Sequence, residues 1–168
     1  KRVFPRLTIN PAWPSGLSHR HGLPEIQGLI KEQNHVITPR INAVSSECAQ
    51  TTGMTAEQVE AAIRDKDINQ LSACFFRCYI NHFGVIRQEG SKDVVNVPAM
   101  LIFVKMYMPS ISILELLSIA SEIMVCAKQF ENSSLQDEQP DCLKTKSLIT
   151  CLAKKDTLIN AFWIATQS

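Results

Sequence analysis

The chain has 168 residues, 45% of them hydrophobic, so it is long enough to form one domain with a substantial core. Its 17 basic and 16 acidic side chains nearly cancel, which argues against nucleic-acid binding and against strong attraction to anionic membrane surfaces. The apolar runs at 98–108 and 111–126 contain charged side chains and lack the ~20 uninterrupted apolar residues that a bilayer requires, so no membrane insertion is expected.

The first 28 residues differ in composition from the rest of the chain. They hold four prolines and three glycines, with Phe4 and Trp13 as isolated apolar side chains, so regular helix is not expected there. We expect residues 1–28 to form an extended arm and residues 29–168 to form a single helical domain. The arm would lie on the body or on a second subunit, giving a homodimer, and a loosely held tail is the alternative. No secretory signal is recognisable, which indicates a chain that has already been processed.

Helical periodicity is weak from Pro24 and clear over residues 39–51. Thr55 followed by Gln58 has the spacing of a capping box and predicts a short helix through Arg64. A central helix is predicted from Ile68 to Phe83, because its apolar side chains cover most of the circumference. Gly84 follows as a left-handed cap.

The second half of the chain predicts five further segments. Residues 84–95 contain Gly90 and alternating charges, so they should form a surface connection. The predicted helices start at Asn96 (with proline in the first turn), at Ser112 and at Pro140. The tail 158–164 is apolar enough that it should pack against the helical domain. No alternating strand pattern is present. The fold class is therefore all-α, a compact bundle of about six to seven helices.

Six cysteines at irregular spacing predict a disulfide framework and an extracellular protein rather than a metal site. Cys74 and Cys78 share one helix face, one turn apart, so they should bond to different segments. Cys142 and Cys151 lie on opposite faces of one helix and should not pair either. Most of the possible pairings remain open, but in each of them the central helix and the last cysteine-bearing helix are both bonded to two different segments. A bundle cross-linked in this way can tolerate an unfilled interior.

The order of the cysteine gaps, with three residues between Cys74 and Cys78 and eight between Cys142 and Cys151, resembles the six-cysteine signature of insect odorant-binding proteins of the pheromone and general odorant-binding class. The segments 53–57 and 78–85 are also similar to that family's local sequence. The resemblance covers residues 36–165. It implies three disulfides, an apolar cavity, and secretion into an extracellular fluid; the pairs it implies are Cys48–Cys78, Cys74–Cys142 and Cys126–Cys151.

The resemblance also implies reversible carriage of a small hydrophobic molecule, odorant or pheromone-like, without cofactor or catalysis, and a chemosensory receptor is a candidate partner. Helix faces that do not carry the cysteines should line the pocket, and the tail should form part of its wall. For each position ordinary core packing is the alternative. The predicted ligand-binding residues are Phe76, Ile80, Met100, Val104, Leu116, Ala120, Ile123, Leu148, Leu152, Phe162 and Trp163.

Catalytic motifs are not recognisable: the chain has no glycine-rich phosphate loop, no nucleophile elbow and no cluster of histidines and carboxylates. Two other functions remain open, a secreted helical signalling or interaction protein with a filled core, and a carrier of hydrophobic ligands outside olfaction. Asn132 begins a glycosylation sequon between two predicted helices.

Overall fold

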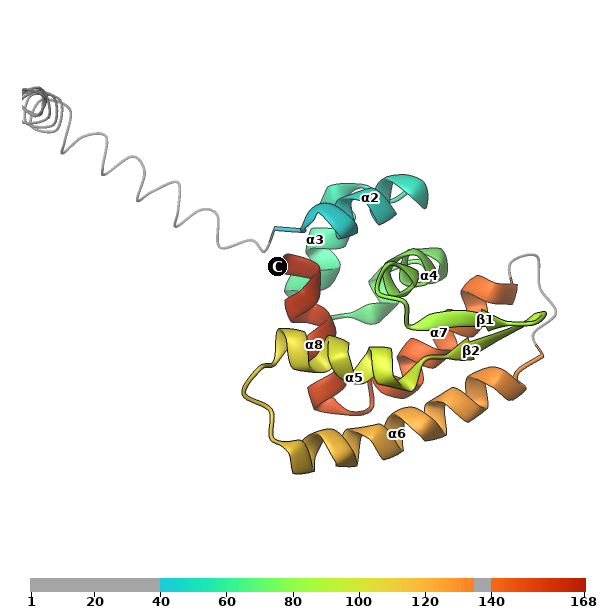
Figure 1. Cartoon of the computed structure of the whole chain (residues 1–168). Helices are drawn as coiled ribbons and strands as arrows, with labels where there is room; N and C mark the ends of the chain where they lie inside the picture. Colours follow the sequence, from blue (N-terminus) through green and yellow to red (C-terminus); the bar gives the residue numbers. More distant parts are fainter. Residues whose placement is uncertain (1–39, 135–139) are drawn as a thin grey trace, which may run out of the picture. The chain divides into compact units, whose positions relative to one another are not determined.

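We describe a computed structural model of residues 40–134 and 140–168 (Figure 1). This part of the chain forms seven α-helices, one short 3₁₀ helix and one β-hairpin, which confirms the all-α class. The expected arm at residues 1–28 lies outside the described residues. The elements are α2 Ala43–Thr51, α3 Ala56–Asp65, η2 Ile68–Gln70, α4 Ala73–His82, β1 Ile86–Glu89, β2 Lys92–Val95, α5 Val97–Tyr107, α6 Ile113–Asn132, α7 Pro140–Leu152 and α8 Asp156–Gln167.

Side-chain caps determine where most of these helices begin. Thr55 and Gln58 form the predicted capping box at the start of α3, with Gln58 N–H donating to the Thr55 hydroxyl and Thr55 N–H donating to the Gln58 side chain. Asn96 caps α5 and Ser112 caps α6 in the same local way, by accepting an N–H three residues on. Because a cap involves only neighbouring residues, these starts could be predicted from sequence.

The central helix is shorter than predicted. The predicted 68–83 segment is divided into η2 and α4, because Ser72 caps α4 by accepting the Phe75 N–H and Leu71 takes an extended conformation with a buried side chain. Phe83 and Gly84 end the helix, and Gly84 has the predicted left-handed backbone, with a φ of 68°.

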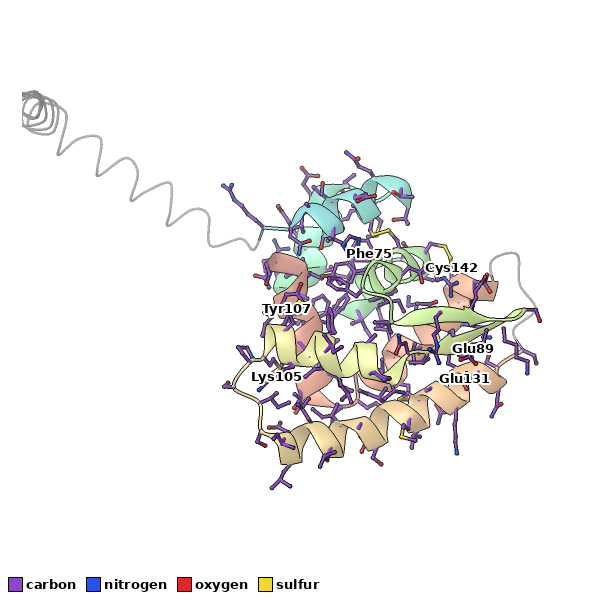
Figure 2. The ribbon with its side chains drawn as sticks, in the orientation of Figure 1. Phe75, Glu89, Lys105, Tyr107, Glu131 and Cys142 are labelled. Carbon is purple, nitrogen blue, oxygen red and sulfur yellow. A yellow bond between two sulfur atoms is a disulfide. The ribbon has the colours of Figure 1, made fainter. Side chains whose placement is uncertain are left out.

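The predicted surface connection at 84–95 contains an antiparallel hairpin, a feature that the sequence pattern missed. Ile86 pairs with Val95, and these are the only hairpin residues whose side chains are buried, so no alternation was visible in the sequence. Gly90 turns the chain with a φ of 65°. The Val95 N–H donates to the carboxylate of Glu131 on α6 (Figure 2), which ties the hairpin to the bundle.

Helix α4 lies at the centre of the core, where it packs against α2, α7 and β1 (Figure 1). Phe75, Phe76 and Tyr79 are fully buried. Phe162 from α8 joins them, with ring centroids 5.6 Å from Phe76 and 5.4 Å from Tyr79. Aromatic contacts at these distances contribute about 0.5–1.5 kcal/mol each beyond the burial of area, so they hold α8 firmly on α4.

Three disulfides cross-link the bundle, and they are the pairs that the family resemblance implies. Cys48–Cys78 joins α2 to α4, Cys74–Cys142 joins α4 to α7, and Cys126–Cys151 joins α6 to α7. Helices α4 and α7 are therefore each bonded to two neighbours. None of the described helices is both long and apolar enough to cross a membrane.

Candidate ligand-binding cavity

A cavity of about 30 Å³ lies where α4, α5, α7 and α8 meet. Its lining is entirely apolar. No charged or hydrogen-bonding side chain lines it. The lining residues are Ile80, Phe83, Val85, Met100, Phe103, Ile149, Leu152, Ala153, Leu158, Ile159 and Phe162.

The turn after α4 places the first wall of the cavity. Gly84 reverses the chain, and the Val85 N–H then donates to the Ile80 carbonyl at 3.2 Å, which directs the chain back toward the core. The Asn96 N–H donates to the Val85 carbonyl at 2.7 Å, and so the start of α5 is fixed beside this turn. On α5, Phe103 packs edge-on against Phe83 with ring centroids 4.9 Å apart.

Helix α8 supplies the opposite wall of this cavity through Leu158, Ile159 and Phe162. Its first turn is held by Thr157, whose hydroxyl donates to the Glu115 carboxylate of α6 at 3.0 Å. Its last turn is held by α2. There the Asn42 side-chain amide donates to the Ala165 carbonyl at 2.6 Å and the Ser45 hydroxyl donates to the Thr166 carbonyl at 3.1 Å. Both ends of this wall are thus anchored to other helices.

Eleven residues were predicted to bind the ligand, and the structure places four of them in the lining: Ile80, Met100, Leu152 and Phe162. Phe76, Val104, Ile123, Leu148 and Trp163 are buried in the core outside the lining, and Leu116 and Ala120 are half-buried on α6. The side of α6 that packs inward is the stripe of Ile119, Ile123, Cys126 and Phe130, and none of these residues reaches the cavity.

The remaining lining residues were not predicted. Two of them could have been found from helical spacing. Phe103 follows Met100 by three residues on α5, and Ile149 precedes Leu152 by three on α7, so each lies on the same helix face as a predicted residue. Val85 carried none, because it lies between a helix and a strand. The unpredicted lining residues are Phe83, Val85, Phe103, Ile149, Ala153, Leu158 and Ile159.

The size of the cavity limits what it can hold without rearrangement. A volume of about 30 Å³ accommodates about two water molecules. Pockets for drug-sized ligands measure about 300–1,000 Å³. A hydrophobic ligand therefore binds here only if wall side chains move outward, and the flexible Met100 side chain is the part of the wall best suited to do so.

Tyr79 lies behind the cavity, against the lining residues Phe83 and Phe162, with ring centroids 5.2 and 5.4 Å away. Its side chain is fully buried, and its hydroxyl has no hydrogen-bond partner in the structure. Burial raises the pKa of this phenol well above its usual value, and the nearby Asn42 and Ser45 side chains offset only part of that shift. In the described residues no group of three or more His, Cys, Asp or Glu side chains is placed to hold a metal ion.

The PBP/GOBP family model matches residues 31–155, which is most of the chain and includes all six cysteines. The chain belongs to the PBP/GOBP family, and the resemblance seen in the sequence is confirmed. Members of this family are secreted binding proteins for small hydrophobic ligands and are not enzymes. Comparisons with curated proteins and with solved structures found no match.

Proposed function

We propose that this protein carries a small, uncharged hydrophobic molecule, odorant or pheromone-like, through an extracellular fluid, and that the ligand occupies the cavity between α4, α5, α7 and α8. The observation that supports this proposal is the entirely apolar lining of that cavity in a member of a ligand-carrier family. An unpaired charge in this lining would cost several kcal/mol, so charged ligands are disfavoured.

Binding is expected to be driven by removal of apolar surface from water. A ligand that buries about 200 Å² of apolar surface gains about 5 kcal/mol before the costs of ordering and of moving the walls. Because opening the wall costs free energy, affinity should be moderate, which suits a carrier that releases its cargo. A chemosensory receptor is the proposed recipient, and expression in sensory tissue would distinguish odorant carriage from carriage elsewhere.

The test is a fluorescence titration with N-phenyl-1-naphthylamine, followed by displacement with medium-length alcohols, esters and aromatics. We expect micromolar binding to the unmodified protein. Ala153→Phe should weaken it at least ten-fold, because the added ring enters the cavity from its own wall. Lys154→Phe is the matched control: it adds the same ring one residue further on, at an exposed position outside the lining, and should leave affinity unchanged.

The small size of the cavity favours one alternative, a helical signalling or interaction protein whose core is essentially filled. Such a protein would act through its surface. Absence of binding by the naphthylamine probe and by every competitor would select this alternative, and equal effects of the two phenylalanine substitutions would place the ligand elsewhere.

A further inference from the structure

The end of helix α6 carries the only N-glycosylation sequon of the chain. Asn132 is followed by Ser133 and Ser134, and no other asparagine of the 168 residues has a serine or threonine two positions further on. An acceptor asparagine requires this triplet, with any residue except proline in the middle. Because so short a triplet also arises by chance, its place in the fold decides whether it can be used.

The fold places this triplet at the surface, where α6 ends. Asn132 is the last helical residue, and Ser133 is already extended, with a φ of −75° and a ψ of 131°. The Ser133 N–H donates to the Phe130 carbonyl at 3.3 Å, which closes the last turn. Asn132 and Ser134 are both exposed. The sequon therefore leaves the regular helix at its second residue and meets the requirement that an acceptor be accessible.

Asn132 also shares a face of α6 with exposed apolar side chains. Val125 precedes it by seven residues, which at about 100° and 1.5 Å per residue is about 20° round the helix and about 10 Å along it. Leu114, Leu117 and Met124 lie within about 80° of Asn132 on the same face, and they and Val125 are all more than half exposed. The main elements that pack on α6 are α5, α7 and β2, and Figure 1 shows them on one side of the helix.

We propose that Asn132 carries an N-linked oligosaccharide, and that its sugars cover the part of this face around Val125. The inference rests on the secretion proposed above, because a protein meets the sugar donor on the secretory route. An attached oligosaccharide is bulky and solubilising. Its sugar rings have apolar C–H faces and hydrophilic hydroxyls, so they can lie over Val125 while the hydroxyls stay in water. The modification thereby accounts for apolar surface that the described part of the bundle leaves uncovered.

The donor belongs to the class of oligosaccharides linked to an isoprenoid lipid through a diphosphate. The side-chain amide nitrogen of Asn132 attacks the anomeric carbon of the first sugar. A C–N bond forms there as the C–O bond to the diphosphate breaks. The lipid diphosphate leaves with the electron pair of that bond, and the amide nitrogen loses one of its two protons. The Ser134 hydroxyl is not consumed, since it serves only in recognition of the triplet.

The oligosaccharide and the candidate cavity involve different parts of the fold. Helix α6 supplies none of the residues that line the cavity. Sugars at Asn132 should therefore leave the affinity for N-phenyl-1-naphthylamine unchanged. Loss of probe binding with the sugars in place would count against the carrier function alone, so the two proposals can fail separately.

Mass spectrometry of the full chain, secreted from cultured insect cells behind a secretion signal, tests the modification. Most of the secreted molecules should exceed the polypeptide mass, and peptide-N-glycosidase in heavy-oxygen water should remove the excess and leave labelled aspartate at position 132. Ser134→Ala should lose the excess. Ser133→Ala is the matched control, because it changes the neighbouring serine and keeps the acceptor triplet. A secreted protein of bare polypeptide mass, or an excess that persists in Ser134→Ala, would overturn the proposal.

Precipitation by ammonium sulfate tests whether the sugars cover Val125. Val125→Ser should raise the midpoint concentration clearly in the Ser134→Ala background and several-fold less in the glycosylated protein, where the sugars already shield this position. Ile102→Ser is the control, because Ile102 is 63% exposed on α5 and should give the same shift in both forms. Equal shifts for Val125→Ser in the two forms would show that the oligosaccharide extends away from this face.

Discussion

Tyr79 shows how burial of a single polar group affects this protein. Buried tyrosines usually hydrogen-bond through the hydroxyl, yet this one is surrounded mainly by Phe75, Phe83 and Phe162 and makes no hydrogen bond. The folded protein therefore retains a neutral phenol at a pH where an unfolded chain would already ionise it. Folding therefore disfavours release of the Tyr79 proton, and release of that proton disfavours folding.

This opposition predicts a specific loss of stability in alkali. Below pH 10 the phenol is neutral in both states and contributes no pH dependence. Above pH 10 the unfolded chain releases this proton and the folded chain does not, so the free energy of unfolding should fall by about 1.4 kcal/mol per pH unit. Urea titrations between pH 8 and about 11 would measure it. Tyr79→Phe should abolish this component with little change in stability at pH 7, and a decline that persists unchanged in the variant would contradict the prediction.

The ion pair between Arg77 of α4 and Asp93 of β2 is a second feature at the residue scale that affects stability. Its nitrogen and oxygen are 2.9 Å apart, and the two side chains are only 18% and 11% exposed. The other terminal nitrogen of Arg77, Nη1, is buried without a hydrogen-bond partner. The positive charge of this guanidinium is therefore compensated by Asp93. The pair connects the hairpin to the central helix.

Asp93→Ala should therefore cost about 2–3 kcal/mol of unfolding free energy, because it leaves a largely buried cation unpaired. Glu89→Ala provides a comparison on the same hairpin. Its ion pair with Arg87 is shorter, at 2.7 Å, but both side chains are more than half exposed, and removal should cost under about 0.5 kcal/mol. Chemical denaturation measures both values. Similar costs for the two variants would show that burial does not control these pairs.

At the scale of elements, the contact between α2 and α8 decides how firmly one wall of the cavity is held. The last carbonyls of any helix lack partners within that helix. Those of Ala165 and Thr166 accept instead from Asn42 and Ser45 at the start of α2. Asn42 has a second task, since its side-chain oxygen caps α2 by accepting the Ser45 N–H at 2.9 Å.

Two substitutions should separate these tasks. Asn42→Asp keeps the capping oxygen and replaces the amide donor with a carboxylate oxygen that repels the Ala165 carbonyl, so it should release the end of α8 while α2 remains capped. Asn42→Ala removes the donor without this repulsion and also removes the cap, whose loss should cost about 1 kcal/mol. Hydrogen exchange of the last turn of α8 should accelerate in both variants, and ligand dissociation should accelerate with it. Unchanged exchange in α8 would show that the aromatic contacts of Phe162 hold this wall alone.

At the scale of the molecule, the disulfides close loops with sequence separations of 30, 68 and 25 residues, and the stabilisation rises only with the logarithm of loop length. In the chain-entropy model each contributes about 3–4 kcal/mol, so together they match the whole stability of a typical domain. Their positions differ relative to the cavity. Cys151 directly precedes Leu152 and Ala153 of the lining, whereas Cys142 lies at the opposite end of α7.

Paired substitutions to serine should therefore have similar effects on stability and different effects on binding. Removing Cys126–Cys151 should weaken naphthylamine binding several-fold, because the cavity end of α7 is no longer tied to α6. Removing Cys74–Cys142 should cost at least as much stability and leave affinity nearly unchanged. Thermal unfolding and probe titration on both double variants make the comparison, and the opposite order of binding losses would contradict this assignment.

The sequence alone determined the features that depend on neighbouring residues. The capping box at Thr55, the caps at Asn96 and Ser112 and the left-handed Gly84 involve groups no more than a few positions apart, so local pattern was sufficient to predict them. The cysteine spacings and their flanking residues likewise identified the family.

The tertiary structure decided which apolar residues face each other. Phe76 and Ile80 on α4 are both buried and only one helical turn apart, yet only Ile80 lines the cavity. Their difference depends on where α5, α7 and α8 lie, and helical periodicity cannot supply that position. The same holds for α6, because the sequence shows a helix apolar on two sides but not which side the bundle covers. Burial is a property of packing between distant segments, and only the fold brings those segments together.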